Sequence, residues 1–172
     1  MSESLLIQVE RARFERALEM TESMARHRVL LTTAELARIN NTTLGKPVTE
    51  DPWRRESTDI TLRSGRALTF SLHTDPVLSL REKLHRATEL AEAGQIIDAA
   101  VDVYGGLVLS HFFKDANRRT AVLAAHFFLQ RYGIPLSGLA IHEMGLGDLR
   151  EEGQIDALRA TLQNMAKFVT KK

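Results

Sequence analysis

The segment from Gln95 to Ser110 is apolar on almost every side, and it constrains the fold more than any other part of the sequence. A helix of this composition is stable in water only when other elements surround it, so the segment predicts a central core helix. The chain has 172 residues, of which 44% are hydrophobic and 26% charged. That length and balance predict one domain over residues 1–172, built around the buried helix.

Helical periodicity continues on both sides of this segment, so the predicted fold class is mainly α. Apolar residues recur at helical spacing over about residues 4–28, 33–39, 75–93, 117–132 and 153–168. Thr33 and Asn117 are the expected N-caps of two of these helices, and Phe168 is expected on the apolar face of the last. Residues 40–51 are polar and contain glycine and proline, so they are expected to form a loop.

The period changes to that of a β-hairpin over about residues 59–71. The turn is expected at Ser64-Gly65, because glycine can adopt the positive φ of a tight turn. The apolar residues on either side of it are Ile60, Leu62, Leu68 and Phe70. An irregular surface loop is the alternative interpretation.

The overall charge excludes few partners but favours none. Lysine and arginine number 23 against 22 acidic residues, so a large nucleic-acid partner is not expected. There is no cysteine, which removes disulfides and thiolate chemistry. The first residues lack the pattern of a signal peptide, and no apolar run approaches the roughly 18 residues of a membrane helix. We therefore expect a cytoplasmic protein without a membrane partner.

The segment from His111 to Arg119 joins two predicted helices and concentrates polar side chains. The start of the second helix has free backbone N–H groups and a partial positive charge, which suits a phosphate. Arg118 and Arg119 add two cations there, although cations destabilise a helix start, and this favours an anion bound between them. Asn117 can cap the helix or offer its amide to a phosphate oxygen.

Two further side chains in this segment could take part in a reaction. His111 has a pKa range that lets it accept a hydroxyl proton near neutral pH. Asp115 could hold Mg²⁺ with one carboxylate and several waters. Taken singly, each residue is more often a cap, a core residue or a surface charge. Their joint occurrence within nine residues favours a functional site.

The segment resembles the signature loop of the Fic/Doc family, in which certain residues recur at fixed spacing. Those positions are occupied here by His111, Phe113, Asp115, Ala116, Asn117 and Arg119. The likeness is close over residues 111–119 and looser over about 33–168. It implies a Fic-type helical bundle with a small β-hairpin flap.

The resemblance also implies roles for these residues in transfer from ATP, or another nucleoside triphosphate, to a hydroxyl side chain of a target protein. His111 would be the general base, Asp115 would hold Mg²⁺, and Phe113 would anchor the loop in the core. The nucleotide-binding residues would be Ala116, Asn117, Arg118 and Arg119. The target protein would dock at the hairpin flap by strand pairing.

Two positions depart from the family members that transfer AMP. Those proteins usually carry glycine between the asparagine and the arginine, and a second arginine three residues later. This sequence has Arg118 and Val122 there. A cation after the asparagine is more similar to the Doc branch, in which phosphoryl is transferred. Phosphoryl transfer is therefore slightly favoured, with AMP transfer (protein adenylylation) as the alternative.

The inhibitory pattern of many Fic proteins is incomplete here. The nearest candidates are Thr88 to Glu92 and Asp148 to Glu152, and each departs from the pattern at one end. An inhibitory glutamate would also lack its usual arginine, because Val122 occupies that position. We therefore expect any restraint to come from a separate protein, as antitoxins restrain Doc-like toxins.

Two other classes of function remain open on sequence grounds. One is a helical module that binds a nucleotide without turnover. The other is a nucleic-acid-binding helix using Arg118, Arg119 and Arg131, which is disfavoured because that helix is otherwise largely apolar. Gly105-Gly106 is expected to serve close helix packing. Trp53 and Arg54 receive no functional role, since a lone tryptophan is more often a packing residue.

Overall fold

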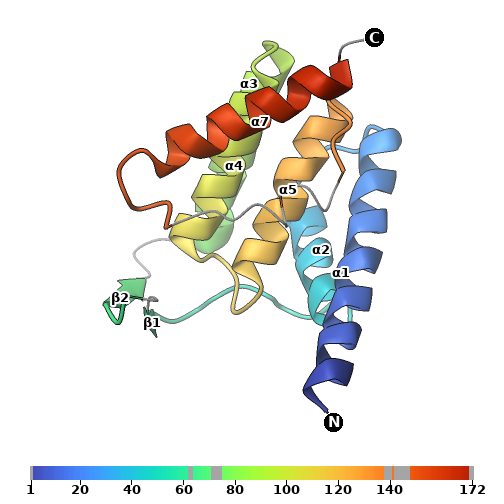
Figure 1. The fold of residues 1–172 in the computed structure, drawn as a ribbon. Coiled ribbons are helices and arrows are strands. Elements are labelled where there is room, and N and C mark those ends of the chain that lie inside the picture. The colour runs from blue at the N-terminus through green and yellow to red at the C-terminus, as the bar shows by residue number, and fades with distance from the viewer. Residues whose placement is uncertain (1, 62–63, 71–74, 138–140, 142–147, 171–172) are drawn as a thin grey trace.

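The computed structural model describes residues 2–61, 64–70, 75–137, 141 and 148–170. Within these ranges the chain is mainly helical with one antiparallel pair of strands, which confirms the predicted fold class. The elements in Figure 1 are α1 (Glu3–Arg26), α2 (Thr33–Leu44), β1 (Thr58–Thr61), β2 (Ala67–Phe70), α3 (Pro76–Glu92), α4 (Ile96–Ser110), α5 (Asn117–Arg131) and α7 (Gln154–Thr170).

Two helices, α4 and α5, form the centre of the bundle. They pack against each other, with α3 and α7 against α4, and α1 and α2 against α5 (Figure 1). The more enclosed of the two is α5, because every side chain from Thr120 to Leu129 is buried. Small residues at Ala121, Ala124 and Ala125 let neighbouring helices approach closely. The predicted core helix, α4, has one side open to a groove.

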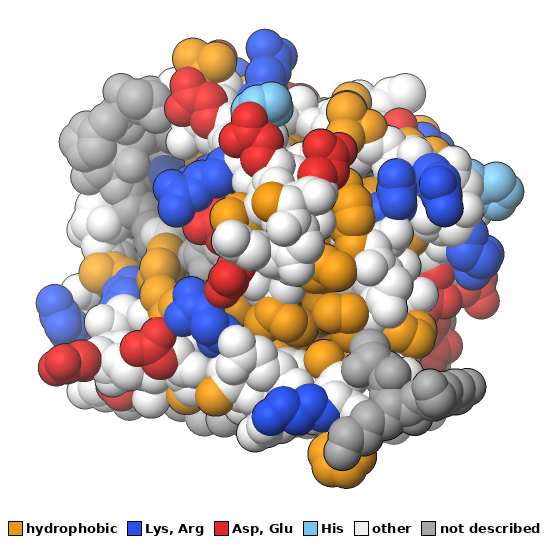
Figure 2. Space-filling model, turned by 90° about the horizontal axis from the view of Figure 1, so that it is seen from above, with side chains coloured by type: hydrophobic (Ala, Val, Ile, Leu, Met, Phe, Trp, Pro, Cys, Tyr) orange, Lys and Arg blue, Asp and Glu red, His pale blue; other side chains and the backbone are white. Residues whose placement is uncertain are grey.

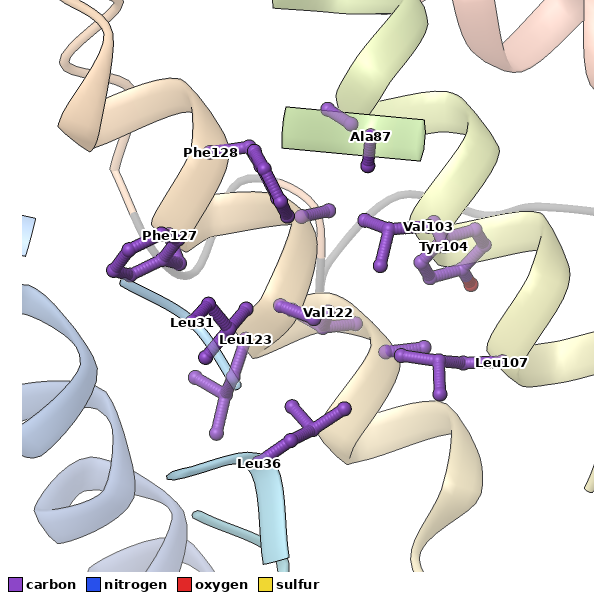
Figure 3. Close-up of a cluster of buried hydrophobic side chains, with 14 of the residues drawn as sticks. Leu31, Leu36, Ala87, Val103, Tyr104, Leu107, Val122, Leu123, Phe127 and Phe128 are labelled. Carbon is purple, nitrogen blue, oxygen red and sulfur yellow. The ribbon is translucent and has the colours of Figure 1, made fainter. Parts of the chain in front are cut away.

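The contacts between these layers are made by aliphatic and aromatic side chains (Figure 3). Val103 and Leu107 of α4 extend toward Val122 of α5, and Leu36 of α2 approaches α5 from its other side. Leu36 and Leu107 are fully buried. Burying a side chain of this size stabilises the fold by about 1.5–3 kcal/mol. The bundle therefore fixes where α4 ends and where α5 begins.

The second helix is longer than predicted. Its N-cap is Thr32, whose hydroxyl accepts a hydrogen bond from the Glu35 N–H at 3.3 Å, and the predicted cap Thr33 is the first residue of the helix. It then continues to Leu44 through residues predicted as loop. The prediction was wrong there because the polar side chains of this last turn are buried and bonded within the fold. Asn41, for example, donates to the Glu50 carbonyl at 2.9 Å.

The first, third and last helices follow their predicted bounds closely. The helix predicted over about 4–28 is α1, and α3 begins with an Asp75 carboxylate that accepts from the Val77 N–H at 2.9 Å. In α7, Leu158 and Leu162 are buried as expected. Phe168 was wrongly assigned to the buried face, because it is 85% exposed. Helical spacing brings the neighbouring Val169 onto the core instead.

The predicted hairpin is formed by β1 and β2, paired from Thr58 opposite Phe70 to Thr61 opposite Ala67. The Thr69 hydroxyl donates to the Asp59 carboxylate across the strands at 2.6 Å. Gly65 has the positive φ expected of the turn, at 82°. Leu62 and position 71 of the predicted hairpin lie outside the described residues. The hairpin lies at the same end of the bundle as the α4–α5 loop (Figure 1).

The surface is mixed in character. Seen from above, hydrophobic side chains gather in the middle of the molecule and charged side chains of both signs surround them (Figure 2). Across the described part of the chain, we find no helix with the length and apolar character needed to cross a membrane.

A buried histidine links α5 to α1. His126 is fully buried, and its Nε2 donates to the Glu22 carboxylate at 3.0 Å. Its Nδ1 is among the buried atoms that have no hydrogen-bond partner in the described structure. Burial lowers the pKa of His126 below its ordinary 6.5, against the smaller raising effect of Glu22. The imidazole is therefore neutral in the folded protein.

This pair predicts a loss of stability in acid. As the pH falls below about 6.5, the unfolded chain takes up the proton that the folded chain refuses, so the free energy of unfolding decreases. Each pH unit between the two pKa values corresponds to about 1.4 kcal/mol. Thermal melts between about pH 7.5 and pH 5.5 should show a shallower pH dependence for His126→Gln than for the parent. The exposed His85→Gln is the matched control, and an equal effect in both variants would contradict the assignment.

Candidate functional site

The loop between α4 and α5 begins and ends with a left-handed residue. His111 ends α4 with φ 51° and ψ 60°, and Ala116 precedes α5 with φ 57° and ψ 31°. Histidine is one of the non-glycine residues that occur in this region more often than average. Alanine is not, so its conformation must be held by the surrounding contacts. The left-handed conformations of His111 and Ala116 change the direction of the chain between the end of α4 and the start of α5.

The His111 side chain is half-buried at the end of α4. Its Nδ1 lies 3.3 Å from the Val108 carbonyl, which can only accept, so Nδ1 carries the hydrogen and Nε2 is the basic nitrogen. Burial is the main reason that the pKa of His111 lies below 6.5, and the Arg54 and Arg150 cations lower it further. The Val108 hydrogen bond acts in the opposite direction. The imidazole is thus a neutral proton acceptor at pH 7.

Asn117 is the first residue of α5 and not its N-cap, which corrects the sequence prediction. The capping position belongs to Ala116, which has no side-chain cap bond. The Asn117 amide is buried and clasps the backbone of Phe113 instead: its Oδ1 accepts from the Phe113 N–H and its Nδ2 donates to the Phe113 carbonyl, both at 3.0 Å. Its side chain therefore shapes the loop.

Phe113 lies in the core, as the anchoring role requires. Its side chain is fully buried, and its ring stacks on Trp53 with the centroids 4.9 Å apart. Trp53 and Phe113 also form an isolated antiparallel bridge, extended by hydrogen bonds from Arg54 N–H to the Phe112 carbonyl at 2.9 Å and from Lys114 N–H to the Pro52 carbonyl at 3.0 Å. Residues 51–54 therefore run as a strap beside the loop.

An open cavity of about 480 Å³ lies beside this loop. Every residue predicted for catalysis, metal binding or nucleotide binding contributes to its wall. The lining residues are Val108, His111, Lys114, Asp115, Ala116, Asn117, Arg118 and Arg119. The cavity thus joins a neutral imidazole to the N-terminus of α5, where backbone N–H groups and three cationic side chains favour an anion.

The charged residues of the cavity differ in accessibility. Asp115 and Arg118 are exposed, and Arg119 is partly buried. One Asp115 oxygen accepts from the Ala116 N–H at 2.7 Å, which orients the carboxylate. Arg118 lies near the phenol of Tyr104, whose pKa is raised chiefly by burial and lowered to a smaller extent by Arg118. An exposed, oriented carboxylate is a ligand of the kind that Mg²⁺ takes, because this ion keeps several waters.

Val122 occupies the position at which family members that transfer AMP usually carry a second arginine. It is 1% exposed and packs in the core one turn beyond Arg119.

The Gly105-Gly106 pair lines a second cavity of about 530 Å³ between α3, α4 and α7. A Cβ on Gly105 would meet nothing within 4 Å, and one on Gly106 would meet the Lys83 side chain at 3.1 Å. The packing interpretation therefore fits Gly106, against which a side chain of α3 packs closely, and does not fit Gly105.

Two residues that support the loop were missed by sequence analysis. Asn40 is fully buried and donates from Nδ2 to the Asp115 carbonyl at 2.9 Å and to the Thr120 hydroxyl at 3.0 Å. Arg54 is 7% exposed and donates from Nε to the His111 carbonyl at 2.5 Å. Both lie more than fifty positions from their partners. No local pattern in the sequence could have identified them.

The likeness of this chain to known proteins lies in its fold. No protein-family model matches the chain, and no curated protein matches it. The structure is similar to that of a Fic domain containing signaling protein from Bacteroides thetaiotaomicron, with a TM-score of 0.68 and 17% sequence identity. The match covers 93% of this chain and 70% of that one. The chain therefore has the fold of a Fic domain.

Proposed function

We propose that the chain is a Fic/Doc-type transferase that moves a phosphate-containing group from ATP to a hydroxyl side chain of a target protein. The observation that carries this proposal is the composition of the 480 Å³ cavity, which combines the neutral His111 with the cationic start of α5. Charge develops on the transferred group during such a reaction, and fixed cations and backbone dipoles stabilise it.

In the proposed step, a target hydroxyl oxygen forms a bond to phosphorus as the bond from phosphorus to the leaving oxygen breaks. The hydroxyl proton passes to Nε2 of His111, and the leaving group departs as ADP, or as pyrophosphate if AMP is transferred. Arg119 and the first N–H groups of α5 bind the phosphate oxygens. The Asn117 side chain acts indirectly, by holding Phe113 and so the shape of the loop.

Phosphoryl transfer is the form of the reaction that we favour. The buried Val122 offers no cation one turn into α5, so a second arginine does not bind the outer phosphates from that position. Arg118, exposed at the mouth of the cavity, adds positive charge next to Arg119 instead. AMP transfer uses the same base and the same helix start, and the product analysis below distinguishes the two.

The target would dock along the β1–β2 hairpin. Among the described residues these strands pair only with each other, and an extended segment can pair with the edge of such a sheet through backbone hydrogen bonds.

A separate antitoxin protein is our proposal for any restraint on the enzyme. Expressed without it, the chain should then inhibit growth.

The decisive experiment is mass spectrometry of a lysate incubated with the protein, ATP and Mg²⁺. Addition of phosphate to Ser, Thr or Tyr of a target supports phosphoryl transfer, and addition of AMP supports adenylylation. The same reactions with His111→Asn show which additions depend on this chain. Nucleotide binding without any modified protein would instead indicate a binding module without turnover.

Asp115→Asn should weaken the binding of Mg²⁺ and so raise the concentration of Mg²⁺ that transfer requires. The amide keeps the size of the side chain and can still accept from Ala116 N–H, but it loses the charge that Mg²⁺ prefers. Loss of even an outer-shell partner costs about 10–100-fold in metal affinity, so half-maximal transfer should need at least that much more Mg²⁺. Asp156→Asn on α7, whose side chain is 83% exposed, is the matched control. A parental Mg²⁺ response in Asp115→Asn would exclude this carboxylate as the ligand.

A further inference from the structure

Arg54 makes three hydrogen bonds to the end of α4 and the residues that follow it. Its Nε donates to the His111 carbonyl at 2.5 Å and its Nη2 to the Ser110 carbonyl at 3.3 Å. Its backbone N–H donates to the Phe112 carbonyl at 2.9 Å. Three consecutive carbonyls, from residue 110 to residue 112, therefore accept from this one residue.

These contacts serve a specific need of the α4 C-terminus. The last carbonyls of a helix have no partner within it, and glycine in the left-handed conformation usually provides the exit. Here the exit residue is His111, with φ 51°. Its conformation is less favourable than that of glycine, and the planar guanidinium fork compensates by binding two adjacent carbonyls. A cation also suits the negative end of the helix dipole.

The Arg54 side chain is itself fixed. It is 7% exposed, and its Nη1 donates to the Glu56 carbonyl at 2.6 Å, two residues before β1. The preceding Trp53 stacks on Phe113. Because the guanidinium group is buried and hydrogen-bonded on both sides, it has little freedom to move. It can therefore fix the position of the carbonyl groups that it binds.

We propose that Arg54 is a positioning residue that fixes the backbone of His111 and so the direction of its imidazole into the cavity. This role rests on the proposed function of His111 as the general base. Arg54 binds the carbonyl of His111 and is not one of the residues that line the cavity. It would therefore act on the reaction through His111.

Electrostatics support the same role. The Arg54 cation is one of the causes of the lowered pKa of His111, after burial. Among the described residues, Arg150 before α7 also lowers this pKa, and the charged side chains that line the same cavity are Lys114 and Asp115 in the loop and Arg118 and Arg119 on α5. Removing a nearby cation stabilises the imidazolium, so loss of Arg54 should raise the pKa of His111.

The test compares Arg54→Gln and Arg54→Lys with the adjacent Arg55→Gln. Arg55 is a matched control because its side chain is 58% exposed and pairs only with Asp51 among the described residues. The pKa of His111 is measured by NMR titration of protein labelled at histidine, with His111→Asn to assign its signal. Transfer is measured as kcat and KM for ATP across pH, and folding by thermal melts.

Arg54→Gln should raise the pKa of His111, move the acidic limb of the kcat profile to higher pH, and lower kcat by up to about 10²-fold with little change in KM. Arg54→Lys keeps the positive charge but loses the planar guanidinium group. The pKa of His111 should then stay near the parental value, and kcat should lie between those of the parent and Arg54→Gln. Arg55→Gln should match the parent in every measurement.

A folded Arg54→Gln with parental His111 pKa and parental kcat would overturn the proposal. If that variant does not fold, Arg54→Lys decides: a reduced kcat at unchanged KM supports the role, and a parental kcat overturns it. The NMR titration needs no substrate, so it gives its answer even if the parent transfers nothing. Failure of the proposed function would then be distinguishable from failure of the positioning role.

Discussion

His111→Asn should lower transfer by about 10²–10⁴-fold while the protein keeps its fold, because the general base is removed from an otherwise intact cavity. Asparagine is the informative replacement, since it tolerates the left-handed conformation that His111 adopts at φ 51°. Alanine removes the base as well, but it carries a backbone cost at this position. Initial rates of target modification at saturating ATP provide the measurement.

The control for His111→Asn is His85→Asn. His85 is exposed on α3 and pairs with Glu89 at 3.1 Å, outside the cavity. Its replacement should leave the rate unchanged. Near-parental transfer by a folded His111→Asn protein would show that another group accepts the hydroxyl proton, and the proposed mechanism would fail.

Phe113→Ala should destabilise the protein by about 3–5 kcal/mol, the typical cost of removing a buried phenylalanine side chain. The ring is 0% exposed and stacked on Trp53, so its removal leaves a cavity that the strap and the loop cannot easily fill. Native proteins are stable by only about 5–15 kcal/mol, so this single change removes a large part of the total. Urea denaturation followed by circular dichroism measures it.

Phe168→Ala is the matched control for this substitution. It makes the same chemical change on α7, where the ring is 85% exposed, so its effect should be within about 0.5 kcal/mol of zero. Equal denaturation midpoints for Phe113→Ala and the parent would contradict the burial of Phe113. Because the Asn117 amide clasps the backbone at Phe113, the remaining folded Phe113→Ala molecules should still have the loop approximately in place.

Local sequence signals predicted most of the fold. Asp75-Pro76 marks the start of α3, and the apolar run ending at Ser110 marks the end of α4, because caps and periodicity depend on neighbouring residues. The six loop positions that suggested the site all line the cavity or anchor beside it. The likeness in fold to a Fic domain agrees with what those positions indicated.

The errors arose where hydrogen bonds made in the folded chain override the local preference of the residue type. Asn40 and Asn41 are polar, and a polar run with a glycine beyond it predicts a loop. In the folded chain both side chains are buried. Asn40 bonds to residues 75 and 80 positions away, and Asn41 bonds to the loop seven and nine positions on, so the helix continues through them. Asn117 is a favourable N-cap by residue type, yet its amide bonds to Phe113 and Ala116 takes the capping position. Capping preference and hydrophobic periodicity do not identify these hydrogen-bond partners.

The stack of Trp53 on Phe113 gives the protein a built-in spectroscopic probe. Trp53 is the single tryptophan of the chain, so all of its indole fluorescence originates beside the loop that carries His111. The indole is 9% exposed, and any shift of the strap or the loop changes its contact with solvent and with the aromatic ring below it. Emission wavelength and quenching by iodide therefore follow this loop in the unlabelled protein, and a nucleotide titration can be read in real time.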